Sequence, residues 1–111
     1  MAVGAGRQGR LVSPALRDAL ARVHEARLGA ASAMRAADVQ FERFARGLAM
    51  LPPLGEDGAA HAWFRVVTDC EHTLDAEDLR VDARKLDAAH SALDALWDEL
   101  GRVIDLALGA S

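Results

Sequence analysis

Apolar residues recur regularly between Leu16 and Leu51. Each lies three or four residues after the one before it, and the one polar member of the series is Arg27. This spacing predicts an α-helix with a continuous apolar stripe, which packs lengthwise against other helices. The members of the stripe are Leu16, Leu20, Val23, Arg27, Ala30, Met34, Ala37, Phe41, Phe44, Leu48 and Leu51.

The first helix is predicted to run from about residue 14 to residue 50. Ser13 followed by Pro14 suits a helix start, because serine caps free amides and proline fits the first helical position. The stripe keeps its phase across Gly29, so we expect no turn there. At ~1.5 Å per residue this helix is roughly 55 Å long, which indicates a rod or a hairpin.

Two prolines and two glycines between residues 51 and 58 end that helix. A second helix is expected to begin near Asp57 or Gly58, and its apolar face carries Ala60, Trp63, Val67, Cys70 and Leu74. The phase of this face is lost after Leu74, which predicts a bend near residues 73 to 75.

The last helix is predicted from about residue 76 to residue 108. Its apolar face is wide enough to contact two neighbours. We therefore expect an all-α fold, an elongated antiparallel helical hairpin or three-helix bundle, which dimerises into a four-helix or larger bundle. Residues 1–12 are expected to form a disordered tail and residues 13–109 one domain. The face comprises Leu79, Leu86, Ala89, Leu93, Leu96, Leu100, Val103 and Ala107, flanked by Trp97 and Ile104.

Charge is distributed unequally along the chain. The net charge is −4, but eight arginines against four acids give residues 1–55 a balance of +4, and residues 56–111 carry −8. A basic helix and an acidic helix attract each other, within one chain or between two. Arg27 is expected to select this pairing from within the apolar stripe. Its predicted mates on the last helix are Asp87, Asp94 or Asp98.

The single cysteine, Cys70, excludes an internal disulfide framework and fits a reducing compartment. Neighbouring acids raise a thiol pKa, and its place on an apolar helix face predicts a buried structural residue. We see no cleavable signal and no stretch long enough to span a membrane. The expected location is the cytoplasm, unless export uses a route without such a signal.

Two further patterns suggest chemistry. His24 is followed by Arg27 and Gly29, as in phosphotransfer bundles, but the glycine comes one residue later than expected, so a packed histidine is the preferred interpretation. Asp-x-x-His occurs at Asp69–His72 and at Asp87–His90 and resembles the ligand spacing of di-metal bundles. Aspartate reaches poorly from a helix to a central metal, so neither a metal nor another cofactor is predicted.

The function predicted from these patterns is a non-enzymatic interaction module, such as a small adaptor, chaperone or assembly subunit. It would self-associate as a homodimer and bind a helix of a second protein. Two alternatives remain: histidine phosphotransfer through His24, and a nucleoprotein subunit that contacts phosphates through first-helix residues such as Arg35 and Arg43. The negative net charge disfavours general nucleic-acid binding. The predicted interface residues are Arg27, Met34, Phe41, Phe44, Leu86, Leu93, Leu96, Trp97 and Leu100.

Overall fold

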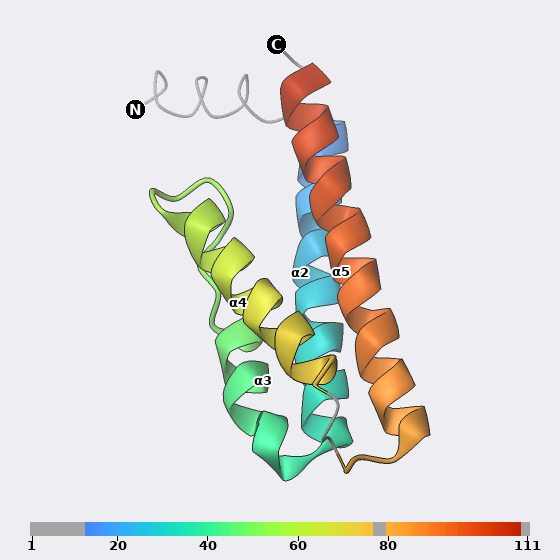
Figure 1. Cartoon of the computed structure of the whole chain (residues 1–111). Coiled ribbons are helices and arrows are strands. Elements are labelled where there is room, and N and C mark those ends of the chain that lie inside the picture. Colours follow the sequence, from blue (N-terminus) through green and yellow to red (C-terminus); the bar gives the residue numbers. More distant parts are fainter. Residues whose placement is uncertain (1–12, 77–79, 110–111) are drawn as a thin grey trace.

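A computed structural model describes residues 13–76 and 80–109, and within these ranges the protein is helical without a strand (Figure 1). The all-α prediction is therefore confirmed. One isolated bridge joins Leu54 and Glu56 in the loop before α4. The elements are α2 (Pro14–Ala37), the short 3-10 helix η1 (Val39–Phe41), α3 (Glu42–Ala49), α4 (Ala59–Leu74) and α5 (Ala83–Gly109).

Helix α2 begins where the sequence predicts but ends earlier. The Ser13 hydroxyl accepts a hydrogen bond from the Leu16 amide at 3.1 Å, and the helix continues through Gly29. It ends at Ala37 because Asp38 adopts extended backbone angles and its carboxylate accepts a bond from the Gln40 amide at 3.2 Å. The single helix predicted for residues 14–50 is therefore wrong.

The apolar stripe does not reveal this reversal because both of its halves face the same core. After η1 the chain folds back, and α3 runs antiparallel to α2 (Figure 1). Phe41, Ala45 and Leu48 then enter the core against Met34 on α2, each with 0% of its surface exposed. Helical spacing predicts which residues are buried, but it does not predict whether the helix continues without a break.

The other helix boundaries are closer to expectation. Gly58 precedes α4 with a φ of 79°, a left-handed conformation that favours glycine, and α4 ends at Leu74 as the predicted bend requires. The last helix begins at Ala83 rather than near residue 76, after the Asp82 carboxylate accepts a bond from the Arg84 amide at 2.9 Å. Leu79, which the predicted face included, lies outside the described residues.

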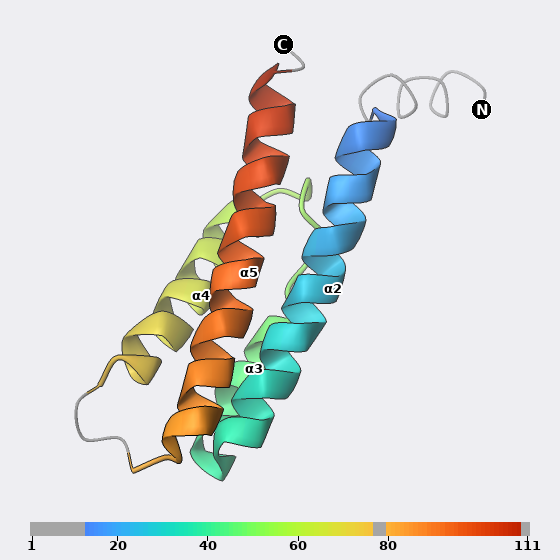
Figure 2. The same ribbon diagram turned by 90° about the vertical axis from the view of Figure 1, so that its right-hand side faces the viewer.

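The long helices α2 and α5 pack antiparallel along their length, as predicted (Figure 2). Alanines in their contact, including Ala19, Ala30 and Ala89, are fully buried and allow close approach. Helices α3 and α4 lie on one side of this pair (Figure 1). The Leu74 end of α4 lies near α5, and the Ala59 end stands apart from α2 and α5 (Figure 1). We call the half with η1 and α3 the closed end, and the half with the start of α4 the open end.

Candidate functional site

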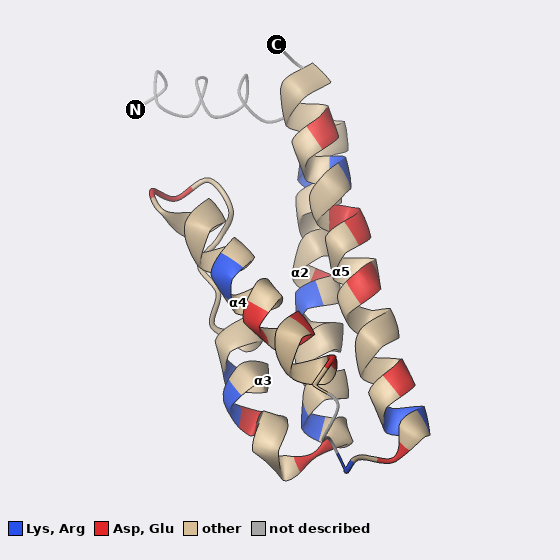
Figure 3. Ribbon diagram, in the orientation of Figure 1, with Lys and Arg blue, Asp and Glu red and all other residues tan. Residues whose placement is uncertain are grey.

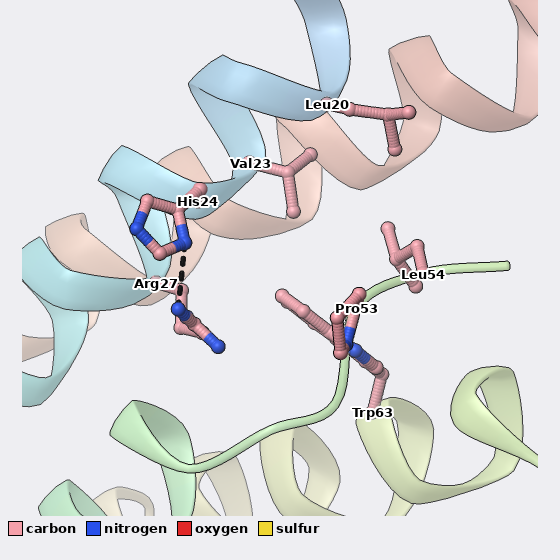
Figure 4. Close-up of a pocket in the computed structure, with 7 residues that line it drawn as sticks. All are labelled: Leu20, Val23, His24, Arg27, Pro53, Leu54 and Trp63. Carbon is pink, nitrogen blue, oxygen red and sulfur yellow. Dashed lines mark hydrogen bonds between the residues drawn. The ribbon is translucent and has the colours of Figure 1, made fainter. Parts of the chain in front are cut away.

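Two hollows lie at the open end, on either side of Trp63. They share Leu54 and Trp63, so the start of α4 and the loop before it form a common wall. The Arg27 pocket, of about 250 Å³, is lined by Leu20, Val23, His24, Arg27, Pro53, Leu54 and Trp63 (Figure 4). The α4–α5 groove, of about 310 Å³, is lined by Leu54, Ala60, Trp63, Phe64, Trp97, Leu100, Val103, Ile104 and Ala107.

The α4–α5 groove is apolar because both of its tryptophans have their N–H groups satisfied elsewhere. The Trp63 indole donates to the Pro52 carbonyl at 2.7 Å, and the Trp97 indole donates to the Glu71 carboxylate at 2.9 Å. Phe64 meets Trp97 edge to face, with ring centroids 6.5 Å apart. The nine lining side chains thus offer hydrocarbon surface to whatever enters the groove.

Large apolar side chains at this groove remain in contact with water. Phe64 is 62% exposed and Ile104 is 57% exposed, although each borders a hollow that would cover it. Exposed apolar surface of this kind, gathered in one place and edged by polar residues, is typical of an interaction site.

Acidic residues follow the outer edge of the groove along α5. Figure 3 shows acidic segments along α5, and Asp94, Asp98 and Asp105 are exposed there. Helical spacing places these three on one side of the helix, with Asp98 and Asp105 turned by about 100° from the groove residues Trp97 and Ile104 that precede them, so they lie outside the groove lining. Glu56 and Asp57 add acidic charge just before α4. The bases nearby are Arg65 beside Phe64 and Arg102 on α5, which pairs with Glu99 at 3.7 Å.

Arg27 extends from α2 toward the loop that contains Pro53 (Figure 4). Its Nη1 donates to the Leu51 carbonyl at 2.7 Å, and its Nη2 lies 2.6 Å from Nδ1 of His24. The guanidinium also lies over the Trp63 ring, 6.0 Å from the centroid. Arg27 therefore joins α2, the loop after α3 and α4.

The predicted pairing of Arg27 with an aspartate of the last helix does not form within the described part of the chain. Among the ion pairs of the described residues none includes Arg27, although only 9% of its surface is exposed. Its Nε is buried and has no hydrogen-bond partner. The chain reversal after Ala37 brings the Leu51 carbonyl beside Arg27, and sequence spacing along one continuous helix could not anticipate that contact.

His24 lies exposed at the mouth of the Arg27 pocket (Figure 4). Because a guanidinium has only donors, His24 Nδ1 accepts the bond from Arg27, so in this arrangement the ring is neutral with its proton on Nε2. The phosphotransfer role of His24 stays a prediction.

The predicted interface residues divide into buried and accessible groups. Met34, Phe41, Leu93 and Leu96 lie in the core with 0–2% of their surface exposed, so a partner could reach them only if the bundle opened. Four others are partly buried at its edge, and two of these line the α4–α5 groove; their binding role stays a prediction. These four are Phe44, Leu86, Trp97 and Leu100.

Sequence reasoning missed Phe64 and Leu54 as parts of a site. Phe64 follows Trp63 and therefore falls outside the regular apolar face of α4, where an aromatic residue is conspicuous. That signal was available. The position of Leu54 opposite α5 depends on the path of the loop and had no sequence signature.

Cys70 is buried as predicted, with 0% exposure. Burial, and secondarily the charge of Asp69, raises the pKa of its thiol to about 12, so the thiolate is scarce at neutral pH. The thiol is therefore unsuited to nucleophilic chemistry.

The residues of the remaining candidate sites lie apart from the two hollows. Asp69 and His72 border a shallow depression between α3 and α4, and His90 bonds Asp75 at 3.0 Å. Residues 13–76 and 80–109 contain no cluster of three or more potential metal ligands. Of the two arginines in the nucleoprotein alternative, Arg35 pairs with Glu42 at 3.0 Å, and Arg43 stacks on its neighbour Phe44.

Comparison with protein families, curated proteins and solved structures found no match. None of the helices in the described residues is long and apolar enough to cross a membrane.

Proposed function

We propose that the protein is a non-enzymatic interaction module that binds a basic amphipathic helix of a partner protein in the α4–α5 groove. The observation that carries the proposal is an apolar groove of about 310 Å³ whose bordering residues Phe64 and Ile104 remain more than half exposed. An amphipathic helix buries its apolar face in a groove of this kind.

The acidic edge of the groove selects the charge of the occupant. A helix whose polar flank carries lysine or arginine would place those bases near Asp98 and Asp105 while its apolar residues enter between α4 and α5. Such charges lie at the rim of the interface, so they contribute mainly to partner selection and to the association rate.

The lining of the groove supports a binding role over a catalytic one. Its nine residues include no carboxylate, histidine, hydroxyl or thiol. General acid-base or nucleophilic catalysis would need at least one such group within reach of a substrate.

The test uses a fluorescent helical peptide of about five turns, with leucines on one face and lysines on the other. Fluorescence anisotropy should report saturable binding that weakens as salt is added, because salt screens the contribution of the acidic edge. A peptide with glutamates in place of lysines should bind more weakly. Equal binding of the two peptides would refute the assigned charge.

Ile104→Gln should weaken binding of the lysine peptide at least about fivefold, since it removes an apolar contact at the groove. Val39→Gln is the matched control, because Val39 is 87% exposed and does not line the groove. If the two variants bound equally well, the peptide would be attached elsewhere.

The expected homodimer provides a competing occupant for the same surface. Sedimentation equilibrium should show a monomer under the proposal. A dimer that Ile104→Gln dissociates and Val39→Gln does not would assign the groove to a second copy of the chain and exclude the basic partner helix from it.

A further inference from the structure

The Arg27 pocket contains a buried positive charge without a negative partner. Arg27 is 9% exposed, and the ion pairs of the described residues do not include it. The Leu51 carbonyl, His24 and the Trp63 face offset part of the cost of burying the guanidinium, but none of them carries a charge. An anion in the pocket would supply the negative charge that the protein does not place beside Arg27.

The guanidinium also retains unused hydrogen-bonding capacity. An arginine has five N–H donors, and two bonds are formed, to Leu51 and to His24. Nε has no partner. Because those two bonds fix the orientation of the planar group, its remaining N–H donors are preorganised, and carboxylate is the anion whose shape matches such a fork.

The rest of the pocket favours a carboxylate that is attached to an apolar group. Its other lining residues are hydrocarbon or aromatic, apart from His24 at the mouth. Val23 and Trp63 are buried on the inner side, while His24 and Pro53 are exposed and border the entrance (Figure 4). A volume of about 250 Å³ suits a small ligand.

We propose that the Arg27 pocket binds a small apolar carboxylate, with the guanidinium of Arg27 holding the carboxylate and Trp63, Leu20 and Leu54 covering the apolar part. The proposed helix-binding function uses the other side of Trp63, so the two activities are testable separately.

The probe is phenylacetate, and its neutral analogue phenylacetamide is the control. Calorimetric titration should detect saturable binding of phenylacetate, and the amide should bind at least about tenfold more weakly because it brings no charge. In parallel, ¹⁵N–¹H spectra should show that phenylacetate shifts the Arg27 Nε–H and Trp63 indole N–H signals. Equal affinity for the two compounds, or no binding of either, would overturn the proposal without the need for any variant.

Arg27→Met keeps most of the side-chain volume and removes the charge, so it should lower phenylacetate affinity at least about tenfold. Ile104→Gln lies in the α4–α5 groove and should leave this affinity unchanged, which separates the pocket from the proposed helix site. A folded Arg27→Met protein that binds phenylacetate normally would refute the assigned role of Arg27.

A carboxylate on an apolar body can be a free acid or the end of a peptide chain. Acetyl-Ala-Ala-Phe with a free C-terminus therefore forms a second arm of the titration. Tighter binding of phenylacetate assigns the pocket to a free acid, and tighter binding of the peptide assigns it to a chain terminus.

Discussion

Large apolar side chains at the two ends of the bundle differ in how far their neighbours cover them. At the closed end, Phe41, Leu48 and Leu93 are covered by neighbouring helices with at most 2% of their surface exposed. At the open end, Phe64 and Ile104 remain more than half exposed because α4 diverges from α2 and α5. Phe41, Leu48 and Leu93 therefore stabilise the fold, whereas Phe64 and Ile104 retain apolar surface that is available for binding.

The largest effect is expected when this contrast is tested with one truncation at each end. Leu93→Ala should cost about 2–5 kcal/mol of unfolding free energy, because it removes a 2% exposed side chain and leaves a cavity. Ile104→Ala should cost less than about 1 kcal/mol, since that side chain already contacts water. Urea denaturation followed by circular dichroism measures both, and similar losses would mean that the open end is closed in solution.

A smaller effect is expected at Arg27, which joins the open-end loop to α2. Arg27→Ala should cost about 1–3 kcal/mol, because the buried Leu51 carbonyl loses its donor. Arg22→Ala, on an exposed face of the same helix, should change stability by no more than about 0.5 kcal/mol. Thermal unfolding distinguishes them, and an unchanged melting temperature for Arg27→Ala would mean that its hydrogen bond does not hold the loop.

Glycine substitutions test the backbone at the start of α4. Gly58→Ala should destabilise the protein by about 1–2 kcal/mol, because alanine is strained at a φ of 79°. Gly29→Ala should instead stabilise by up to about 1 kcal/mol, since Gly29 lies inside α2 with open space around its added Cβ. Effects of the same sign in urea titrations would contradict these backbone assignments.

The smallest effect on stability at neutral pH is expected from ionisation of Cys70, which is buried near the Leu74 end of α4. Its folded pKa of about 12 lies above the ordinary thiol pKa of 9.0, so folding favours the neutral thiol. Stability from this group is complete below pH 9 and is lost as the pH rises toward 12. Relative to Cys70→Ala, the wild type should therefore lose stability only above about pH 9. Parallel curves up to pH 12 would show that the thiol does not ionise differently in the folded and unfolded states.

Much of this arrangement could be predicted from local pattern. The Trp63, Val67, Cys70 and Leu74 face of α4, its end at Leu74 and the start of α2 at Ser13 agree with the expected positions. These features depend on caps, glycine conformation and burial period, which act over a few residues.

The apolar period by itself predicted that the chain is helical, as its described residues are, and that Val23, Met34, Phe41 and Leu93 are buried. Only the tertiary structure decided that the first stripe reverses after Ala37, because a stripe retains its spacing when its two halves fold onto the same core. That reversal brings the Leu51 carbonyl to Arg27. The sequence identified Arg27 as the polar residue in the stripe. It did not identify the Leu51 carbonyl as its partner, since that group belongs to a loop whose path depends on the packing of the whole chain.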